Sequence, residues 1–258
     1  MTILQAIILS LVEGFTEFLP ISSTGHLILT STLLRISQTA FTSTFEIFIQ
    51  LGAIIAISML YGVTAFKDIS TRKNLFYAFI PTAIVGFILY KFIKHYLLQN
   101  PWVVVISLCI GGLILLGIEL LIKPKILAGK SITDLTPQQS ILIGLFQSLS
   151  VIPGVSRAAA TIIGGQIVGL SRSAAVEFSF LLALPTMTAA TALDLIKTDM
   201  HTFGSTEFLL MGIGSIVSCI TAYIVAKLFL KYIQHHSFIV FGIYRILAAI
   251  LFTFFVLR

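Results

Sequence analysis

The residues best suited to chemistry lie between positions 13 and 26, where the sequence EGFTEFLPISSTGH places carboxylates, hydroxyls and an imidazole inside an apolar chain. Ionisable side chains are costly in a bilayer, so such a cluster indicates a functional site by default. Glu13 and Glu17 lie four residues apart and share one face of a helix, where two like charges repel each other. The pair therefore requires a cation or a positive side chain beside it.

Pro20 interrupts this stretch. A proline is poorly tolerated within a helix, so we expect the first helix to end near Leu19. Ser22, Ser23 or Thr24 can then cap a second short helix, whose free backbone N–H groups and dipole favour a bound phosphate.

Ser23 and His26 are three residues apart and face the same way on that second helix. Serines in membrane helices often only cap a helix or bond to a carbonyl one turn back. A serine that shares a face with an imidazole, beside two acids, instead indicates a nucleophile with a base nearby.

The composition excludes an ordinary soluble domain. Apolar residues make up 57% of the 258 residues and charged residues 10%, against roughly 25% charged in soluble domains. The net charge of +6 comes without a basic stripe that contains interleaved aromatics. We therefore assign it to cytoplasmic loops and expect no nucleic-acid partner. The chain is predicted to be an all-α polytopic membrane protein.

Six apolar runs are long enough to cross a bilayer. They are residues 42–62, 75–95, 102–122, 173–193, 208–230 and 238–257. Two further apolar stretches, residues 3–34 and 141–170, are broken by Pro20 and by the segment 153–157. Each half of a broken stretch is too short to span. A pair of halves can enter and leave on one side as a re-entrant hairpin, provided that protein surrounds it.

The two halves of the chain read alike. Residues 1–122 and 140–258 each contain one hairpin followed by three spans, and the polar segment 123–139 is expected to connect them in the cytoplasm. The matching landmarks, 131 to 133 residues apart, are Pro20 with Pro153, Ser23 with Ser156 and Glu46 with Glu177. Because three crossings per half start the second half on the opposite side, this duplication predicts an inverted-topology repeat whose broken elements meet near the midplane.

Arg157 follows Ser156 at the second tip, where its guanidinium would bind phosphate oxygens with two parallel hydrogen bonds. Together the two tips suit phosphoryl transfer, which depends on positioning and charge neutralisation. Ser23 would attack the terminal phosphorus while His26 or Glu17 removes its proton.

Other roles for the charged residues remain open in the sequence. Glu13 and Glu17 would hold Mg²⁺ or Ca²⁺ against a diphosphate. Arg157 has structural alternatives, which are an interfacial position or an ion pair with Glu177. Glu46 and Gln50 either line the site or join helices.

The stretch EGFTEFLPISSTGH resembles, over its full length, the first signature of the undecaprenyl-diphosphate phosphatases, also called bacitracin-resistance proteins. PGVSR at 153–157 resembles the start of that family's second signature, and the similarity extends through FEIFIQLGAI at 45–54 and VEFSFLLALP at 176–185. The resemblance implies removal of the terminal phosphate from undecaprenyl diphosphate. The product would be the monophosphate carrier of cell-wall synthesis, and its recycling would confer bacitracin resistance.

By motif position, the resemblance also implies a divalent cation and a set of acting residues. Those with catalytic importance are Glu13, Glu17, Ser23, His26 and Arg157. Those expected to contact substrate besides Arg157 are Ser22, Thr24, Gln50, Ser156 and Thr161. The chain departs from the family at Ala158–Ala160, where serine and glycine are usual. A hydroxyl role at position 158 is therefore excluded.

A second class of function fits the same architecture. Inverted repeats with broken helices also serve alternating access, so a polyprenyl-phosphate flippase or an anion transporter is the alternative. Ser23 with His26 discriminates between the two, because transport needs no nucleophile.

Location and partners complete the expectation. More lysines and arginines lie on the side of the loops that follow the first, third and fifth spans, which predicts that this side is cytoplasmic. The first hairpin would then open at the outer face of the bacterial cytoplasmic membrane. The expected partners are undecaprenyl diphosphate and membrane lipid, and a homodimer remains open.

Overall fold

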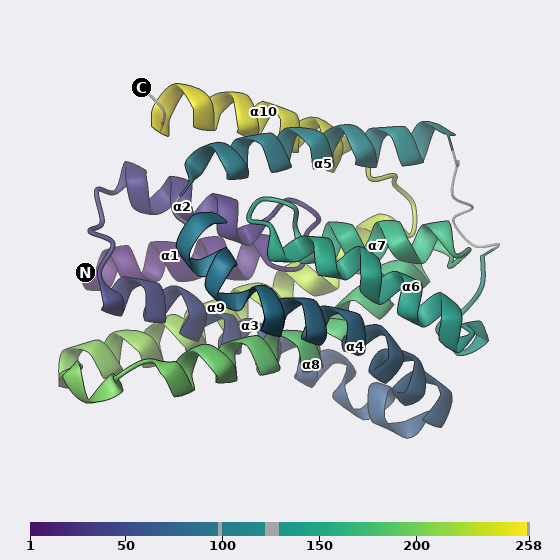
Figure 1. Cartoon of the computed structure of the whole chain (residues 1–258), viewed down its shortest axis with the longest axis horizontal. Coiled ribbons are helices and arrows are strands. Elements are labelled where there is room, and N and C mark those ends of the chain that lie inside the picture. The colour runs from purple at the N-terminus through teal and green to yellow at the C-terminus, as the bar shows by residue number, and fades with distance from the viewer. Residues whose placement is uncertain (98–99, 122–128, 257–258) are drawn as a thin grey trace.

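The computed structural model describes residues 1–97, 100–121 and 129–256, which fold almost entirely into helices (Figure 1). The α-helices are α1 (Ile3–Thr16), α2 (Ser23–Leu33), α3 (Ala40–Lys67), α4 (Ile69–Phe92), α5 (Pro101–Leu121), α6 (Pro137–Ser148), α7 (Arg157–Ile167), α8 (Arg172–Lys197), α9 (Ser205–Ile233) and α10 (Ile239–Val256). A π-helical turn, Ile93–Leu97, follows α4, and short 3-10 turns lie at Ile132–Asp134, Leu149–Val151 and Met200–Thr202. Over these ranges the one β-type pairing is an isolated bridge between Lys130 and Leu170. The all-α prediction is confirmed.

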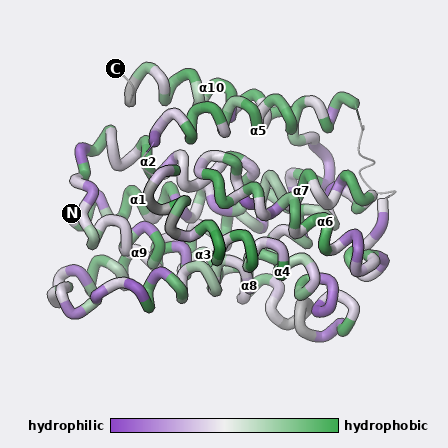
Figure 2. The backbone as a smooth tube through the Cα atoms, in the orientation of Figure 1, coloured by the Kyte–Doolittle hydropathy of each residue, from purple (hydrophilic) through white to green (hydrophobic). Residues whose placement is uncertain are grey.

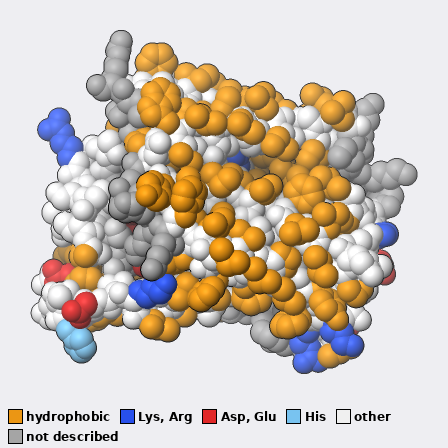
Figure 3. Space-filling view, viewed as in Figure 1, with side chains coloured by type: hydrophobic (Ala, Val, Ile, Leu, Met, Phe, Trp, Pro, Cys, Tyr) orange, Lys and Arg blue, Asp and Glu red, His pale blue; other side chains and the backbone are white. Residues whose placement is uncertain are grey.

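Five helices, α3, α4, α5, α8 and α9, contain stretches long and apolar enough to cross a membrane. Apolar residues lie along these helices, and many of the hydrophilic segments lie toward the two ends of the long axis (Figure 2). Hydrophobic side chains cover the middle of the visible face (Figure 3). Most of the visible charged side chains lie toward the two ends of the long axis. The chain is a multi-pass membrane protein.

The sixth predicted run, residues 238–257, forms α10, which packs along α5 at one side of the molecule (Figure 1). Its apolar part, Ile239–Phe254, is shorter than the five candidate spans. Residue 257, the predicted end of this run, lies outside the described residues, as does residue 122 at the end of the third run.

The two broken stretches form two pairs of short helices, α1 with α2 and α6 with α7. The first pair runs in from one end of the long axis and the second pair from the other, so that their turns meet near the middle of the molecule (Figure 1). α1 packs on α9, and α6 packs on α4. The fourth helix of each half therefore supports the hairpin of the other half.

Two predicted boundaries are corrected. The first helix ends at Thr16 and not near Leu19. Pro20 has no backbone N–H to donate within a helix, and its ring would clash with the carbonyl four residues earlier. α6 begins at Pro137, inside the predicted connection 123–139, because Thr136 forms a capping box and proline suits the first helical position. Residues 123–128 of that connection lie outside the described residues.

Equivalent contacts recur in the two halves at a separation of 134 residues. Gln5 completes the capping box of α1, and its Nε2 donates to the Leu34 carbonyl at 3.3 Å. Gln139 does the same for α6, and its Nε2 donates to the Val168 carbonyl at 3.3 Å. Each hairpin is thus closed at its open end by one glutamine.

Close backbone contacts fix both hairpins against their supporting helices. A Cβ at Gly14 of α1 would lie 2.7 Å from the Ser218 carbonyl oxygen of α9. A Cβ at Gly144 of α6 would lie 2.9 Å from the Ala78 carbonyl carbon of α4. Any other residue would push the helices apart, so glycine at these positions allows each hairpin to pack closely on its supporting helix.

Candidate active site

Each hairpin turn ends in a serine with positive φ, which residues other than glycine rarely adopt. Ser22 has φ 72° and ψ 95°, and Ser156 has φ 73° and ψ 116°. Each side-chain oxygen accepts a hydrogen bond from the backbone N–H three residues on, at 3.4 and 3.1 Å. These matching caps place Ser23 and Arg157 at the first position of α2 and α7. The predicted match of Ser23 with Ser156 is therefore shifted by one residue.

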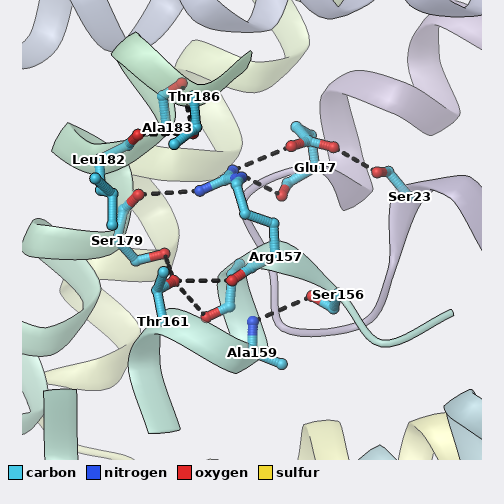
Figure 4. Close-up of polar contacts among 11 residues, drawn as sticks. Glu17, Ser23, Ser156, Arg157, Ala159, Thr161, Ser179, Leu182, Ala183 and Thr186 are labelled. Carbon is cyan, nitrogen blue, oxygen red and sulfur yellow. Dashed lines mark hydrogen bonds and ion pairs between the residues drawn. The ribbon is translucent and has the colours of Figure 1, made fainter. Parts of the chain in front are cut away.

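Glu17 joins the two tips. Ser23 Oγ donates a hydrogen bond to Glu17 Oε2, and Arg157 Nη2 donates to Glu17 Oε1 at 3.0 Å (Figure 4). The Arg157 and Glu17 side chains are only 11% and 8% exposed, so solvent screens this ion pair weakly. The structure thus brings together three of the predicted residues, and it places a carboxylate where it can accept the proton of a serine hydroxyl.

Arg157 is supported from behind by α8. Its Nη1 donates to the Ser179 carbonyl at 2.9 Å (Figure 4). The centroid of the Phe18 ring lies 5.5 Å from Arg157 Cζ. Arg157 Nε is buried and has no acceptor among the described residues. A phosphate oxygen would supply that acceptor. The alternative ion pair with Glu177 does not form, because Glu17 takes that place.

Thr161 lies beside Ser179 and does not line the cavity described below. Its side chain is fully buried, and Oγ1 donates to Ser179 Oγ at 2.6 Å (Figure 4). In this structure it holds Ser179 beneath Arg157, and its contact with substrate stays a prediction.

Glu13 is fully buried, and neither of its carboxylate oxygens has a hydrogen-bond donor in the described part of the chain. Its carboxylate interacts electrostatically with the carboxylates of Glu17 and Glu46 and with the guanidinium of Arg157. Glu46 in turn accepts a hydrogen bond from Ser31 Oγ at 2.9 Å, which joins α3 to α2. The unpartnered oxygens of Glu13 are the kind of donor set that a hard cation satisfies.

No group of three His, Cys, Asp or Glu side chains forms a metal cage within the described residues. Mg²⁺ commonly binds through one or two carboxylates together with phosphate oxygens and waters, so Glu13 with Glu17 fits that pattern.

His26 faces α10 and not Ser23. Its Nδ1 lies 2.7 Å from the Ser22 carbonyl, and its Nε2 lies 2.6 Å from the hydroxyl of Tyr244, whose ring stacks on the imidazole. A carbonyl only accepts, so Nδ1 donates to it, and in the neutral imidazole Nε2 then accepts from the hydroxyl of Tyr244. His26 is also absent from the cavity lining. Of the two bases predicted for Ser23, His26 and Glu17, it is Glu17 that contacts the serine hydroxyl in this structure.

A cavity of about 570 Å³ opens at the tips. Its polar end contains the predicted residues Glu17, Ser22, Ser23, Thr24, Gln50, Ser156 and Arg157. Its wall continues along α4 and α8, where Phe79, Ala83, Phe87, Met187, Ala190 and Leu193 form an apolar surface. A ligand with a charged head and an apolar chain matches this distribution.

The sequence interpretation missed Tyr244 and Arg245. Both lie within the predicted run 238–257, and Arg245 is fully buried. An arginine in the middle of an apolar run is itself a signal of a functional or organising residue. Tyr244 carries no comparable signal, because a tyrosine is ordinary in such a run.

The arrangement can bind and transfer a phosphoryl group. It combines a carboxylate-bound serine, an arginine with a free buried donor, and two helix N-termini that face one cavity.

Comparisons with known proteins agree with this chemistry. A model of the family described as bacitracin resistance protein BacA matches residues 6–251. An undecaprenyl-diphosphatase of Aquifex aeolicus is 49% identical over 257 residues, covering 100% of both chains. One of Sulfurihydrogenibium sp. is 50% identical over 98% of both chains, and one of Methanococcus aeolicus is 43% identical over 100% of both.

Proposed function

The chain belongs to the bacitracin resistance protein BacA family, and we propose that it hydrolyses undecaprenyl diphosphate to undecaprenyl phosphate and inorganic phosphate. The single observation that carries the proposal is the cluster at the meeting point of the two hairpins. There Glu17 accepts hydrogen bonds from Ser23 and from Arg157 of the other half. Recycling of this lipid carrier supports cell-wall synthesis and bacitracin resistance.

Ser23 is the proposed nucleophile and Glu17 its base. Glu17 takes the hydroxyl proton as Oγ attacks the terminal phosphorus, and the bond from phosphorus to the bridging oxygen breaks. Glu17 passes its proton to the departing undecaprenyl phosphate, and a phosphoserine remains. Water then attacks this phosphoserine while Glu17 takes the proton of the water and returns it to Ser23 Oγ, which releases inorganic phosphate and restores both side chains. His26 is assigned a supporting role, because its Nε2 is bound to Tyr244.

Arg157 neutralises the charge that builds up on the transferring phosphoryl group. Its Nε has no acceptor in the described residues, and its two terminal nitrogens are held by Glu17 and Ser179, which fixes the plane of the guanidinium. The N-terminus of α2 directs backbone N–H groups toward the same region.

Glu13 and Glu17 are the proposed ligands of a divalent cation, Mg²⁺ or Ca²⁺. When bound, such an ion neutralises the diphosphate. The support for it is the fully buried Glu13, whose two oxygens lack any hydrogen-bond donor among the described residues. A buried carboxylate without a partner is costly, and a cation would offset that cost.

We also propose that the two halves form an inverted-topology repeat, 1–122 and 140–258, each with a re-entrant hairpin and three spans. The equivalent glutamine contacts and serine caps, 134 residues apart, support it. The exchange of supporting helices between the halves supports it as well. In this arrangement the site would open to the outer face of the bacterial cytoplasmic membrane.

The test is phosphate release from undecaprenyl diphosphate by the purified protein in detergent, with Mg²⁺, with Ca²⁺ and with a chelator. We expect release with a cation, loss in Ser23→Ala, and no change in Ser43→Ala, an exposed serine on α3. A well-folded protein that releases no phosphate with either cation would refute the hydrolase. Transport of the intact lipid across vesicles by that same sample would favour the flippase.

A further inference from the structure

Arg245 is fully buried in α10 and uses every hydrogen-bond donor it has. A guanidinium carries five N–H groups, and each has a backbone carbonyl as acceptor. Nε donates to Leu108 O at 3.3 Å, Nη1 to Pro20 O at 3.1 Å and Val155 O at 3.0 Å, and Nη2 to Ser107 O at 3.0 Å and Gly154 O at 2.9 Å. One side chain therefore binds both hairpin turns and α5.

The carbonyls on the two turns are equivalent ones. Pro20 and Gly154 each lie two residues before the capping serine of their hairpin, 134 residues apart. Arg245 binds both, and a single nitrogen, Nη1, bridges Pro20 of one turn to Val155 of the other. Both turns are thus bound to one rigid, planar group.

The chain also makes room for this group. A Cβ at Gly111 of α5 would lie 2.7 Å from Arg245 Cζ, so glycine is required there. The close approach lets the carbonyls of Ser107 and Leu108, which lie one turn earlier on α5, reach the guanidinium. Arg245 is therefore fixed to a long helix on one side and to both turns on the other.

We propose that Arg245 is a positioning residue that sets the distance between Ser23 and Arg157 by binding the backbone of both turns. It acts through these residues and does not itself contact substrate, since it is absent from the cavity lining. The expected effect on kcat rests on the proposed function. The expected effect on the distance between the two turns is independent of any activity.

The kinetic test uses Arg245→Lys, which keeps the charge but offers three donors from one point in place of five from a plane. A displacement of the reacting groups by about 1 Å lowers the rate by about 100-fold, so we expect a loss of that order in kcat. KM should stay near its original value, because the apolar wall of the cavity does not involve Arg245.

A double-mutant cycle separates positioning from general destabilisation. If Arg245 acts through Arg157, then adding Arg245→Lys to Arg157→Lys should change kcat by no more than about twofold. Full multiplication of the two losses would overturn the proposal. Arg172→Lys is the matched control, because Arg172 is buried in an ion pair with Glu119 at 2.7 Å on residues outside the cavity. It should lower thermal stability and leave kcat unchanged.

The geometric test needs no activity, so it stands even where phosphate release fails. Spin labels on Thr24→Cys and Ser150→Cys, with Cys109 and Cys219 replaced by serine, report the distance between the tips by pulsed electron paramagnetic resonance. We expect a narrow distribution in the parent and in Arg172→Lys. It should be shifted or broadened in Arg245→Lys and in Gly111→Ala, which displaces the guanidinium without removing it. An unchanged distribution in both of the latter variants would overturn the proposal.

Discussion

Substitution of Arg157 by lysine tests how the site binds phosphate. The arginine is held in its plane by the Ser179 carbonyl at 2.9 Å and by Glu17 Oε1 at 3.0 Å, and its buried Nε has no acceptor among the described residues. A lysine ammonium keeps the charge, but its donors diverge from one point and cannot reproduce this planar set. The contacts of the arginine with Glu17 and Ser179 and its contact with phosphate would therefore be lost together.

The expected loss follows from these contacts. A hydrogen bond to a charged group is worth about 2 kcal/mol, and two such bonds would weaken in the transition state. The sum of about 4 kcal/mol corresponds to a fall of about 1000-fold in kcat/KM. Phosphate release from undecaprenyl diphosphate measures it, with Arg72→Lys, an exposed arginine near the start of α4, as control. Arg157→Lys with kcat/KM within about threefold of the parent would refute the planar role.

Three further variants test the support of the site. Tyr244→Phe removes the donor to His26 Nε2, and the loss of about 1 kcal/mol predicts an about fivefold fall in kcat/KM; an unchanged value would mean that the orientation of His26 is irrelevant to turnover. Thr161→Val keeps the shape but leaves Ser179 Oγ without its donor, so kcat should fall severalfold and the melting temperature should drop; normal kinetics would remove Thr161 from the support of Arg157. Gly144→Ala forces α6 away from α4 and should destabilise the protein by about 1 to 3 kcal/mol. A Cβ at Gly117 meets nothing within 4 Å, so the Gly117→Ala variant should have a melting temperature at or above that of the parent. Equal melting temperatures of the two variants would contradict the close backbone contact at Gly144.

Much of the architecture follows from apolar runs and prolines. Their lengths predict five helices that the structure shows to be long enough to span, and their interruptions predict both pairs of short helices. The boundaries were less accurate, because the clash of Pro20 with the carbonyl four residues earlier ends α1 at Thr16. Apolar runs therefore predict that a helix is present, whereas the side chains at its ends, such as Pro20, determine where it ends.

The site was predictable in content but not in contacts. The types and spacing of Glu17, Ser23 and Arg157 indicated one cluster, and the structure brings them together. Helical spacing alone also placed His26 on the same face as Ser23. It could not show that Tyr244, which lies more than two hundred residues further along the chain, occupies the imidazole instead. A partner that comes from a helix distant in the sequence produces no pattern of residue spacing near the residue it contacts.

The most direct test of the account is whether the tips of the two halves meet. Glu17→Cys and Arg157→Cys, in a chain whose Cys109 and Cys219 are serine, can be treated in native membranes with a short bifunctional thiol reagent. A protease site inserted at residues 129–130 then separates the halves unless a link joins them. We predict that the linked halves migrate together as one full-length band and that either single cysteine variant gives two fragments. Two fragments from the double variant, with both thiols shown to be modified, would contradict a shared reaction centre.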